Sequence, residues 1–176
     1  MTKGFTLIEV LVAMFIMVMG TLGIFGLITR TVAFNSSTNS QLVASYLAQE
    51  GLEIVRNIRD ANFLKIHKGV GGIWTDGIIA CVPPYNPPCV VNREADYTTE
   101  TSLNVSQDRF LKISSEGFYN YTAGDDTIFK RNISITQSSG DVLGISVDVS
   151  WQDKENTRTV RGATELYNWL NPTPSP

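Results

Sequence analysis

One carboxylate lies inside an apolar stretch near the start of the chain. Residues 5–28 are 24 residues with a single ionisable side chain, that of Glu9. An ionised group in the hydrocarbon of a membrane costs roughly 2.5–3.5 kcal/mol, so a carboxylate in such a segment is a functional candidate whose partner must be found. The alternative is a carboxylate that only reaches towards the lipid headgroups.

The apolar stretch is long enough to cross a membrane. Its 24 residues would form a helix of about 36 Å, against a hydrocarbon thickness of about 30 Å. A secretory signal would have a shorter apolar run before a small-residue cleavage site, so we expect this segment to stay in the mature protein. Lys3 and the starting amine favour a cytoplasmic N-terminus with the rest of the chain exported, while Arg30 on the far side opposes this bias.

The residues around Glu9 resemble the processing site of type IV prepilins and the related pseudopilins. The resemblance rests on a short basic leader, the Gly4-Phe5 junction, a glutamate five residues into the processed chain, and the apolar run. It implies that a membrane peptidase cleaves after Gly4 and methylates the new amine of Phe5, and that Glu9 acts in filament assembly. The implied partners are this prepilin peptidase and methylase, other pilin subunits through the N-terminal helix, and the inner-membrane assembly machinery.

Two cysteines, Cys81 and Cys89, lie on either side of a proline-rich loop and are the only ones in the chain. Outside the cytoplasm, such a close pair favours a disulfide. A zinc site would need two more ligands that the loop lacks, and the spacing differs from the Cys-x-x-Cys of a redox dithiol. We therefore expect a disulfide bridge.

The residues after the span carry a second helical pattern. Residues 29–40 are polar, weak helix formers, and they could form a hinge or part of one long helix. From Gln41 the periodicity predicts an apolar stripe that packs on a core, made of Val43, Tyr46, Leu47, Gly51, Ile54, Ile58 and Ala61. By the resemblance this is the second half of the long pilin helix, which would end near residue 62.

Alternating residues predict strands in the C-terminal third. Apolar and polar residues alternate over 129–136 and 145–152, and a turn at 153–156 leads into 157–167. Residues 97–101 and 109–113 are further strand candidates in an otherwise irregular region. The predicted fold class is α+β: a long N-terminal helix, membrane-spanning in its first half, is packed by its second half on a small antiparallel C-terminal sheet.

The chain divides into five expected segments. These are a cleaved leader at 1–4, a transmembrane helix at 5–28, a helix continuation at 29–62, an exported globular domain at 63–171 and a proline-rich tail at 172–176. A chain of 176 residues leaves room for one small exported domain. The net charge of −3 gives no basic footprint for a nucleic acid partner.

No arrangement of catalytic residues is recognisable. The chain has one histidine, no Gly-x-Ser-x-Gly and no phosphate-binding glycine loop. We therefore expect a structural subunit of a type IV pilus or a related filament, with no enzyme activity, cofactor or metal. It would first be a single-pass inner-membrane protein with a cytoplasmic N-terminus, and then part of the filament.

The sequence leaves the kind of subunit open. Residues 147–153, 159–161 and 166–170 are similar to the ends of minor pilins of the pilus-modification type, which favours a minor subunit. A pseudopilin of a type II secretion or DNA-uptake system shares every feature of the N-terminal segment. The alternative of a different class is a single-pass, membrane-anchored extracytoplasmic binding domain.

Overall fold

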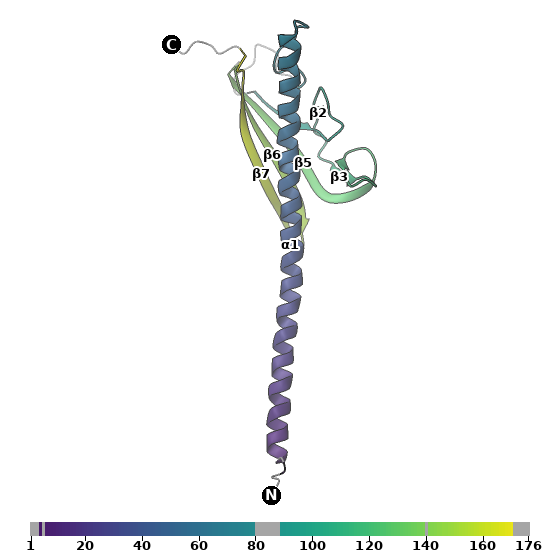
Figure 1. The fold of residues 1–176 in the computed structure, drawn as a ribbon, viewed down its shortest axis with the longest axis vertical. Coiled ribbons are helices and arrows are strands. Elements are labelled where there is room, and N and C mark those ends of the chain that lie inside the picture. The colour runs from purple at the N-terminus through teal and green to yellow at the C-terminus, as the bar shows by residue number, and fades with distance from the viewer. Residues whose placement is uncertain (1–3, 5, 80–88, 140, 171–176) are drawn as a thin grey trace, which may run out of the picture. The chain divides into compact units, whose positions relative to one another are not determined.

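The computed structural model describes residues 4, 6–79, 89–139 and 141–170. Side chains within these ranges are described except those of residues 32–34, 36, 89, 138 and 139. The chain forms two units, Met1–Ser40 and Gln41–Pro176. One helix, α1 (Leu7–His67), begins in the first unit and ends in the second (Figure 1).

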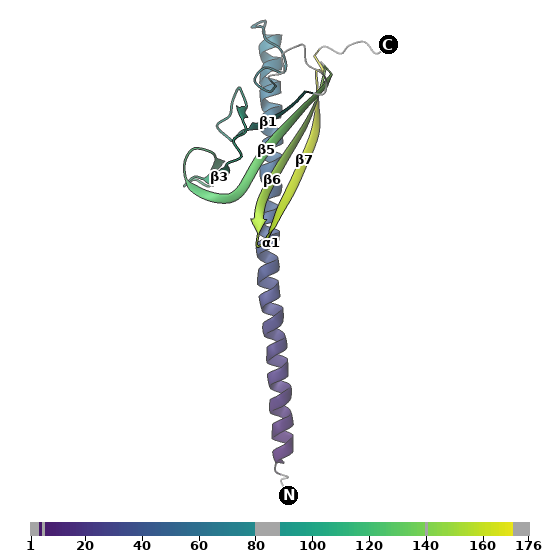
Figure 2. The same ribbon diagram turned by 180° about the vertical axis from the view of Figure 1, so that it is seen from behind.

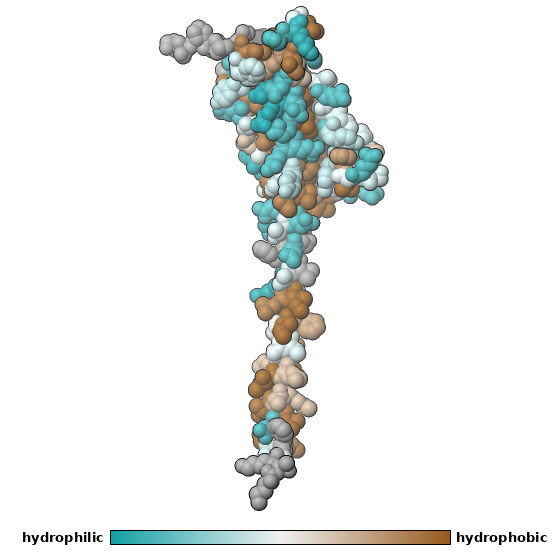
Figure 3. Space-filling model, viewed as in Figure 1, coloured by the Kyte–Doolittle hydropathy of each residue, from teal (hydrophilic) through white to brown (hydrophobic). Residues whose placement is uncertain are grey.

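The first unit contains the N-terminal part of α1. Helix is assigned without a break from residue 7 through residue 40, so the polar stretch at 29–40 continues the helix. Within it, Leu7–Thr31 has the length and mean hydropathy (2.5) of a helix that can cross a membrane, and none of its most apolar window is buried. The brown atoms along this part of α1 in Figure 3 show the same apolar surface.

The second unit contains a seven-stranded antiparallel sheet, and the expected α+β class is confirmed. Three long C-terminal strands form a meander, in which the central strand β6 pairs with β5 and β7. On the side away from β6, the first part of β5 pairs with β3 and its later part pairs with β1 (Figures 1 and 2). The strands are β1 (Cys89–Glu94), β2 (Asn104–Val105), β3 (Phe110–Ile113), β4 (Tyr119–Asn120), β5 (Asp125–Ser139), β6 (Val142–Asp153) and β7 (Asn156–Tyr167).

The strand expected at residues 97–101 is wrong, because this segment begins with a turn. The carboxylate of Asp96 accepts hydrogen bonds from the backbone N–H of Thr98 at 2.9 Å and from its hydroxyl at 2.6 Å. The N–H of Thr99 donates to the backbone carbonyl of Asp96 at 2.9 Å. Such local hydrogen bonds offer the backbone an alternative to a sheet ladder.

The core lies between the second half of α1 and the sheet. The expected stripe is correct at Leu47, Gly51, Ile54 and Ile58, but Tyr46 is wrong, because its side chain is 62% exposed. Leu47, the next residue along the chain, is buried instead of Tyr46. The small residues Ala44 and Ala48 lie on the same buried face, where the strands approach α1 closely. The buried apolar helix residues are Ala44, Leu47, Ala48, Ile54, Val55, Ile58 and Phe63.

Helix α1 ends at His67, five residues beyond the expected end near residue 62. The amide of Asn62 does not cap the helix, since it donates to the backbone carbonyls of Trp74 at 3.3 Å and Asp76 at 2.7 Å. The helix instead ends in a Schellman motif, in which Gly69 has a φ of 72° and its N–H donates to the carbonyl of Ile66 at 3.0 Å.

Gly51 marks the closest approach of α1 to the sheet. A Cβ at this position would lie 2.9 Å from Cγ1 of Val147 and 3.3 Å from Cδ of Arg131. We expect Gly51→Leu to lower the free energy of unfolding by about 1–3 kcal/mol, because overpacking outweighs the gain in helix propensity. Denaturant unfolding measures this. The control Gln49→Leu, at an exposed position on the same helix, should change stability little, and equal losses in the two variants would contradict the close approach.

Candidate functional site

Glu9 lies in the first turn of α1 and caps the helix. Its Oε2 accepts hydrogen bonds from the backbone N–H and the hydroxyl of Thr6, both at 3.5 Å. The N–H groups of Glu9 and Val10 donate to the carbonyl of Thr6 at 3.1 and 3.3 Å. The Thr-x-x-Glu spacing is that of a capping box, and a carboxylate there also interacts favourably with the helix dipole. In the single chain, Glu9 therefore supports the start of its own helix.

The helix surface that follows Glu9 is apolar and unpacked. Leu7, Met17 and Phe25 are 79%, 73% and 70% exposed. The few polar groups are satisfied within the helix: the hydroxyl of Thr21 donates to the carbonyl of Val18 at 2.9 Å, and that of Thr29 to the carbonyl of Gly26 at 3.1 Å. A helix with satisfied hydroxyls and an apolar surface is suited to lipid or to packing among similar helices.

Four glycines of this unit have no structural requirement within the single chain. A Cβ built on Gly4, Gly20, Gly23 or Gly26 would have no atom within 4 Å among the neighbours that can clash. The three glycines inside α1 each cost up to about 1 kcal/mol relative to alanine. Close approach by another helix would give them a role, as small residues have in membrane helices.

The structure does not describe the side chains of Phe5 and the two cysteines. Phe5, on the far side of the processing junction from Gly4, lies outside the described residues, as does Cys81. Cys89 is described only in its backbone, at the start of β1. The Cys81–Cys89 bridge therefore stays a prediction.

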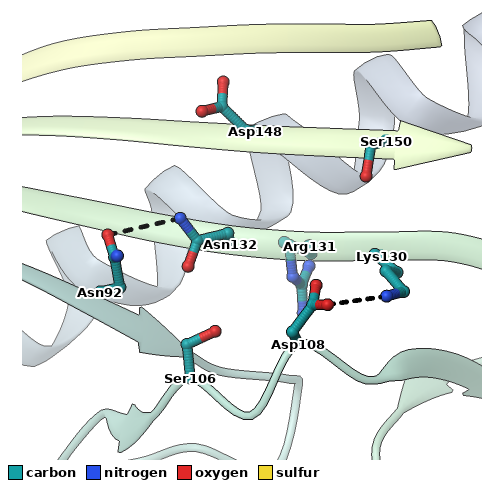
Figure 4. A pocket seen from close by; sticks show the side chains of 8 residues that line it. All are labelled: Asn92, Ser106, Asp108, Lys130, Arg131, Asn132, Asp148 and Ser150. Atoms are coloured by element: carbon teal, nitrogen blue, oxygen red, sulfur yellow. Dashed lines mark hydrogen bonds and ion pairs between the residues drawn. The ribbon is translucent and has the colours of Figure 1, made fainter. Parts of the chain in front are cut away.

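The second unit has a polar groove of about 410 Å³ on the face of the sheet opposite α1 (Figure 4). Its charged groups are already paired: Lys130 Nζ lies 2.9 Å from Asp108 Oδ2, and Asp148 Oδ1 lies 2.6 Å from Arg161 Nε. None of the lining residues that the structure describes is a histidine or a cysteine, and these residues offer hydrogen bonds. The lining residues are Asn92, Ser106, Asp108, Lys130, Arg131, Asn132, Asp148 and Ser150.

Sequence reasoning missed this groove in part. The outward positions of β5 and β6 follow from the alternation, which places Asn132, Asp148 and Ser150 on the polar face. No local signal places Asn92 and Asp108 beside them, because β1 and the loop before β3 lie in the irregular region. Within the described part of the chain, no group of three or more His, Cys, Asp or Glu residues could hold a metal ion.

Residues 1–25 match the family described as "Prokaryotic N-terminal methylation motif". Together with the apolar N-terminal helix, this match fits a type IV pilin-like prepilin signal. The match covers the leader, Glu9 and most of the exposed apolar helix, and it supports a precursor of the type IV pilin-like or pseudopilin class. Comparisons with curated proteins and with solved structures found no match.

The prepilin signal carries implications for processing and location. It implies processing by a prepilin peptidase and assembly with other pilins. Together with the apolar helix, it is consistent with membrane anchoring followed by incorporation into a pilus. Members of the pilin-like family, which this signal resembles, are structural proteins.

Proposed function

We propose that the chain is a minor structural subunit of a type IV pilus or a related filament. It is made as a prepilin, cleaved after Gly4, methylated at Phe5 and assembled through its apolar helix. A pseudopilin of a secretion or DNA-uptake system would use the same steps.

One observation carries this proposal: the prepilin signal at residues 1–25 continues into a helix whose apolar surface is unpacked in the single chain. Exposed apolar surface of this extent needs a cover, which lipid provides before assembly and similar helices provide after it. The glycines at 20, 23 and 26 leave room for those helices. A membrane-anchored binding domain would use the lipid contact alone.

The proposal assigns a role to each segment. Residues 1–4 are the leader, 5–28 cross the inner membrane with the N-terminus in the cytoplasm, and 29–62 continue the helix. Residues 63–171 belong to the exported domain, and 172–176 are the tail. Lys3 and the amine before it support this orientation by the positive-inside rule.

Intact-mass measurement of the protein from membranes tests the proposal. A mature chain that begins at Phe5 and carries one N-methyl group is the expected result. A chain that keeps Met1–Gly4 in cells with an active prepilin peptidase would contradict the proposal and favour the anchored binding domain.

A substitution at Gly4 tests the cleavage step. We expect Gly4→Leu to abolish cleavage, because a peptidase that works at the membrane surface must fit the residue before the cut, whereas the chain itself has room for a side chain there. Gly20→Leu is the matched control, since its site is equally open, and it should be cleaved normally. The mature mass of each variant gives the answer, and a normal mature mass in Gly4→Leu would refute the assignment of the junction.

A further inference from the structure

The end of α1 and the loop after it expose large apolar side chains in the second unit. Leu64, Val70, Ile73 and Trp169 are 57%, 73%, 60% and 59% exposed, and we call these four residues the apolar end surface. Large exposed apolar side chains that gather on one surface mark interaction sites in soluble domains.

The apolar end surface is built on a rigid base. The ring of Trp169 packs edge-on against Phe63 with centroids 4.8 Å apart, and Phe63 stacks on buried Trp74 at 6.2 Å. Two cavities of about 480 and 340 Å³ share His67 and Leu170 in their walls. Aromatic packing therefore holds Trp169 in place, with Leu64 beside it in the wall of the first cavity and Ile73 in the wall of the second.

The loop presents its aliphatic side chains outward. In a Schellman motif the residue after the left-handed glycine usually packs on an apolar helix residue, but Val70 has Lys65 at that position, to whose carbonyl its N–H donates at 3.0 Å. The N–H of Ile73 donates to Oδ2 of Asp76 at 2.8 Å, which fixes the backbone while the side chain stays exposed. Neither side chain is used to hold the fold together.

Two lysines lie on the segment that carries this surface. Lys65 and His67 lie in the last turn of α1 and Lys68 follows it, and neither lysine has an ion-pair partner within the residues that the structure describes. Of the nearby acids, Asp60 pairs with Arg59 at 2.8 Å, and Asp76 accepts the hydrogen bond from the N–H of Ile73 but has no ion pair among the described residues. A chain of net charge −3 thus places a local basic group beside exposed apolar residues.

We propose that the apolar end surface, with Lys65 and Lys68, binds the surface of an anionic lipid membrane. Val70 and Ile73 would enter the boundary between headgroups and acyl chains, and Trp169 would lie at headgroup depth, where tryptophan is enriched. The lysines would contact lipid phosphates, each contributing about 1 kcal/mol near an anionic surface. This goes beyond the proposed function and does not rest on it, because it requires neither cleavage nor a filament.

The test uses the full chain held by α1 in phosphatidylcholine nanodiscs, so that the apolar helix is already covered. Acceptor vesicles are either phosphatidylcholine alone or phosphatidylcholine mixed with phosphatidylglycerol, and flotation measures bound nanodiscs. We expect binding to the anionic vesicles that weakens as salt is raised. Equal binding to both vesicles, or binding to neither, overturns the proposal.

Two double variants and matched controls locate the contact. Lys65→Gln/Lys68→Gln should weaken binding roughly thirtyfold, the loss of two such lysine contacts, and Val70→Ser/Ile73→Ser should weaken it by about tenfold or more. Lys154→Gln removes a lysine of the β6–β7 turn that has no ion-pair partner among the described residues, and Val105→Ser removes a side chain that is 66% exposed; both should bind normally. Equal losses in the controls overturn the proposal.

Tryptophan fluorescence provides a second readout. Trp169 is exposed, while Trp74 and Trp151 are 6% and 4% exposed, so brominated acyl chains in the acceptor vesicles should quench Trp169 first. Quenching that persists in Trp169→Phe would overturn the assigned depth. Association of the nanodiscs with one another, lost in Val70→Ser/Ile73→Ser, would assign the surface to a second copy and also overturn the lipid proposal.

Discussion

We expect Glu9→Val to be inserted, cleaved and folded normally, but to appear in filaments at least about tenfold less than the wild type. In a filament core, Glu9 would be surrounded by apolar side chains such as those of Leu7 and Leu11, where an unpaired charge costs several kcal/mol. The nearest available cation is the amine that cleavage exposes at Phe5. A neighbouring subunit shifted along the axis could place its own amine against this carboxylate, so that the pair also sets the register.

The capping contact of Glu9 requires a control that separates it from charge pairing. Glu9→Gln keeps an oxygen that can accept the hydrogen bonds from Thr6 and retains a capping box, but it has no charge. If pairing with the amine is the role, Glu9→Gln assembles as poorly as Glu9→Val, while Glu9→Asp keeps part of the function. If capping is the role, Glu9→Gln assembles normally.

Purified filaments and the membrane fraction give the measurement for Glu9. The ratio of assembled to membrane-bound subunit is compared between each variant and the wild type, with the mature mass checked first. Wild-type abundance of Glu9→Val along the filaments would refute the pairing.

Arg131→Ala should lower the free energy of unfolding by about 3–5 kcal/mol, the largest loss we expect from one substitution in the second unit, because it leaves a cavity and removes the donors to two backbone carbonyls. The side chain of Arg131 is 0% exposed and its Nη1 lies 2.9 Å from Oε2 of Glu50. Nη1 also donates to the carbonyl of Leu47 at 3.1 Å, and Nη2 donates to that of Ala95. One guanidinium therefore joins α1, β5 and the end of β1.

The loss of stability in Arg131→Ala comes partly from lost volume and partly from lost polar contacts, and a second variant separates the two. Arg131→Met should cost less than Arg131→Ala, because methionine fills most of the volume that alanine would leave as a cavity. Glu50 is 33% exposed and can be hydrated in both variants. Arg158→Met breaks the ion pair with Asp153, in which the arginine is 55% exposed, and should cost no more than about 1 kcal/mol. Denaturant unfolding gives the three values, and a loss in Arg131→Ala no larger than that in Arg158→Met would contradict the proposed role.

The first unit could be predicted from sequence almost completely. Its signal is local: one carboxylate at a fixed distance from a glycine, inside a run of apolar residues, specifies a helix whatever the rest of the chain does. The Thr6 contact of Glu9 is equally local, because the two residues are one helical turn apart. Only the polar stretch at 29–40 was undecided, since weak helix formers do not distinguish a hinge from a continuing helix.

In the second unit, only the strands in which apolar and polar residues alternate over many positions could be predicted. The meander of β5, β6 and β7 follows from alternation over many residues, and the inward position of Arg131 follows from the same alternation. The pattern cannot say what a buried arginine contacts, because Glu50 and Ala95 are separated from it by 81 and 36 residues. The short strands β2 and β4 have two residues each, too few for any period.

The sequence by itself determined the prepilin signal, the apolar helix and the α+β class, because each depends on the order of neighbouring residues. The tertiary structure decided which face of α1 is buried, with Tyr46 outside and Gly51 against Val147. It also decided that Val70 and Ile73 of the loop after α1 stay outside the core while Trp74 of the same loop is buried, and that the two exposed side chains lie beside lysines with no ion-pair partner among the described residues. These outcomes depend on contacts between segments distant in sequence, and no local pattern records such contacts.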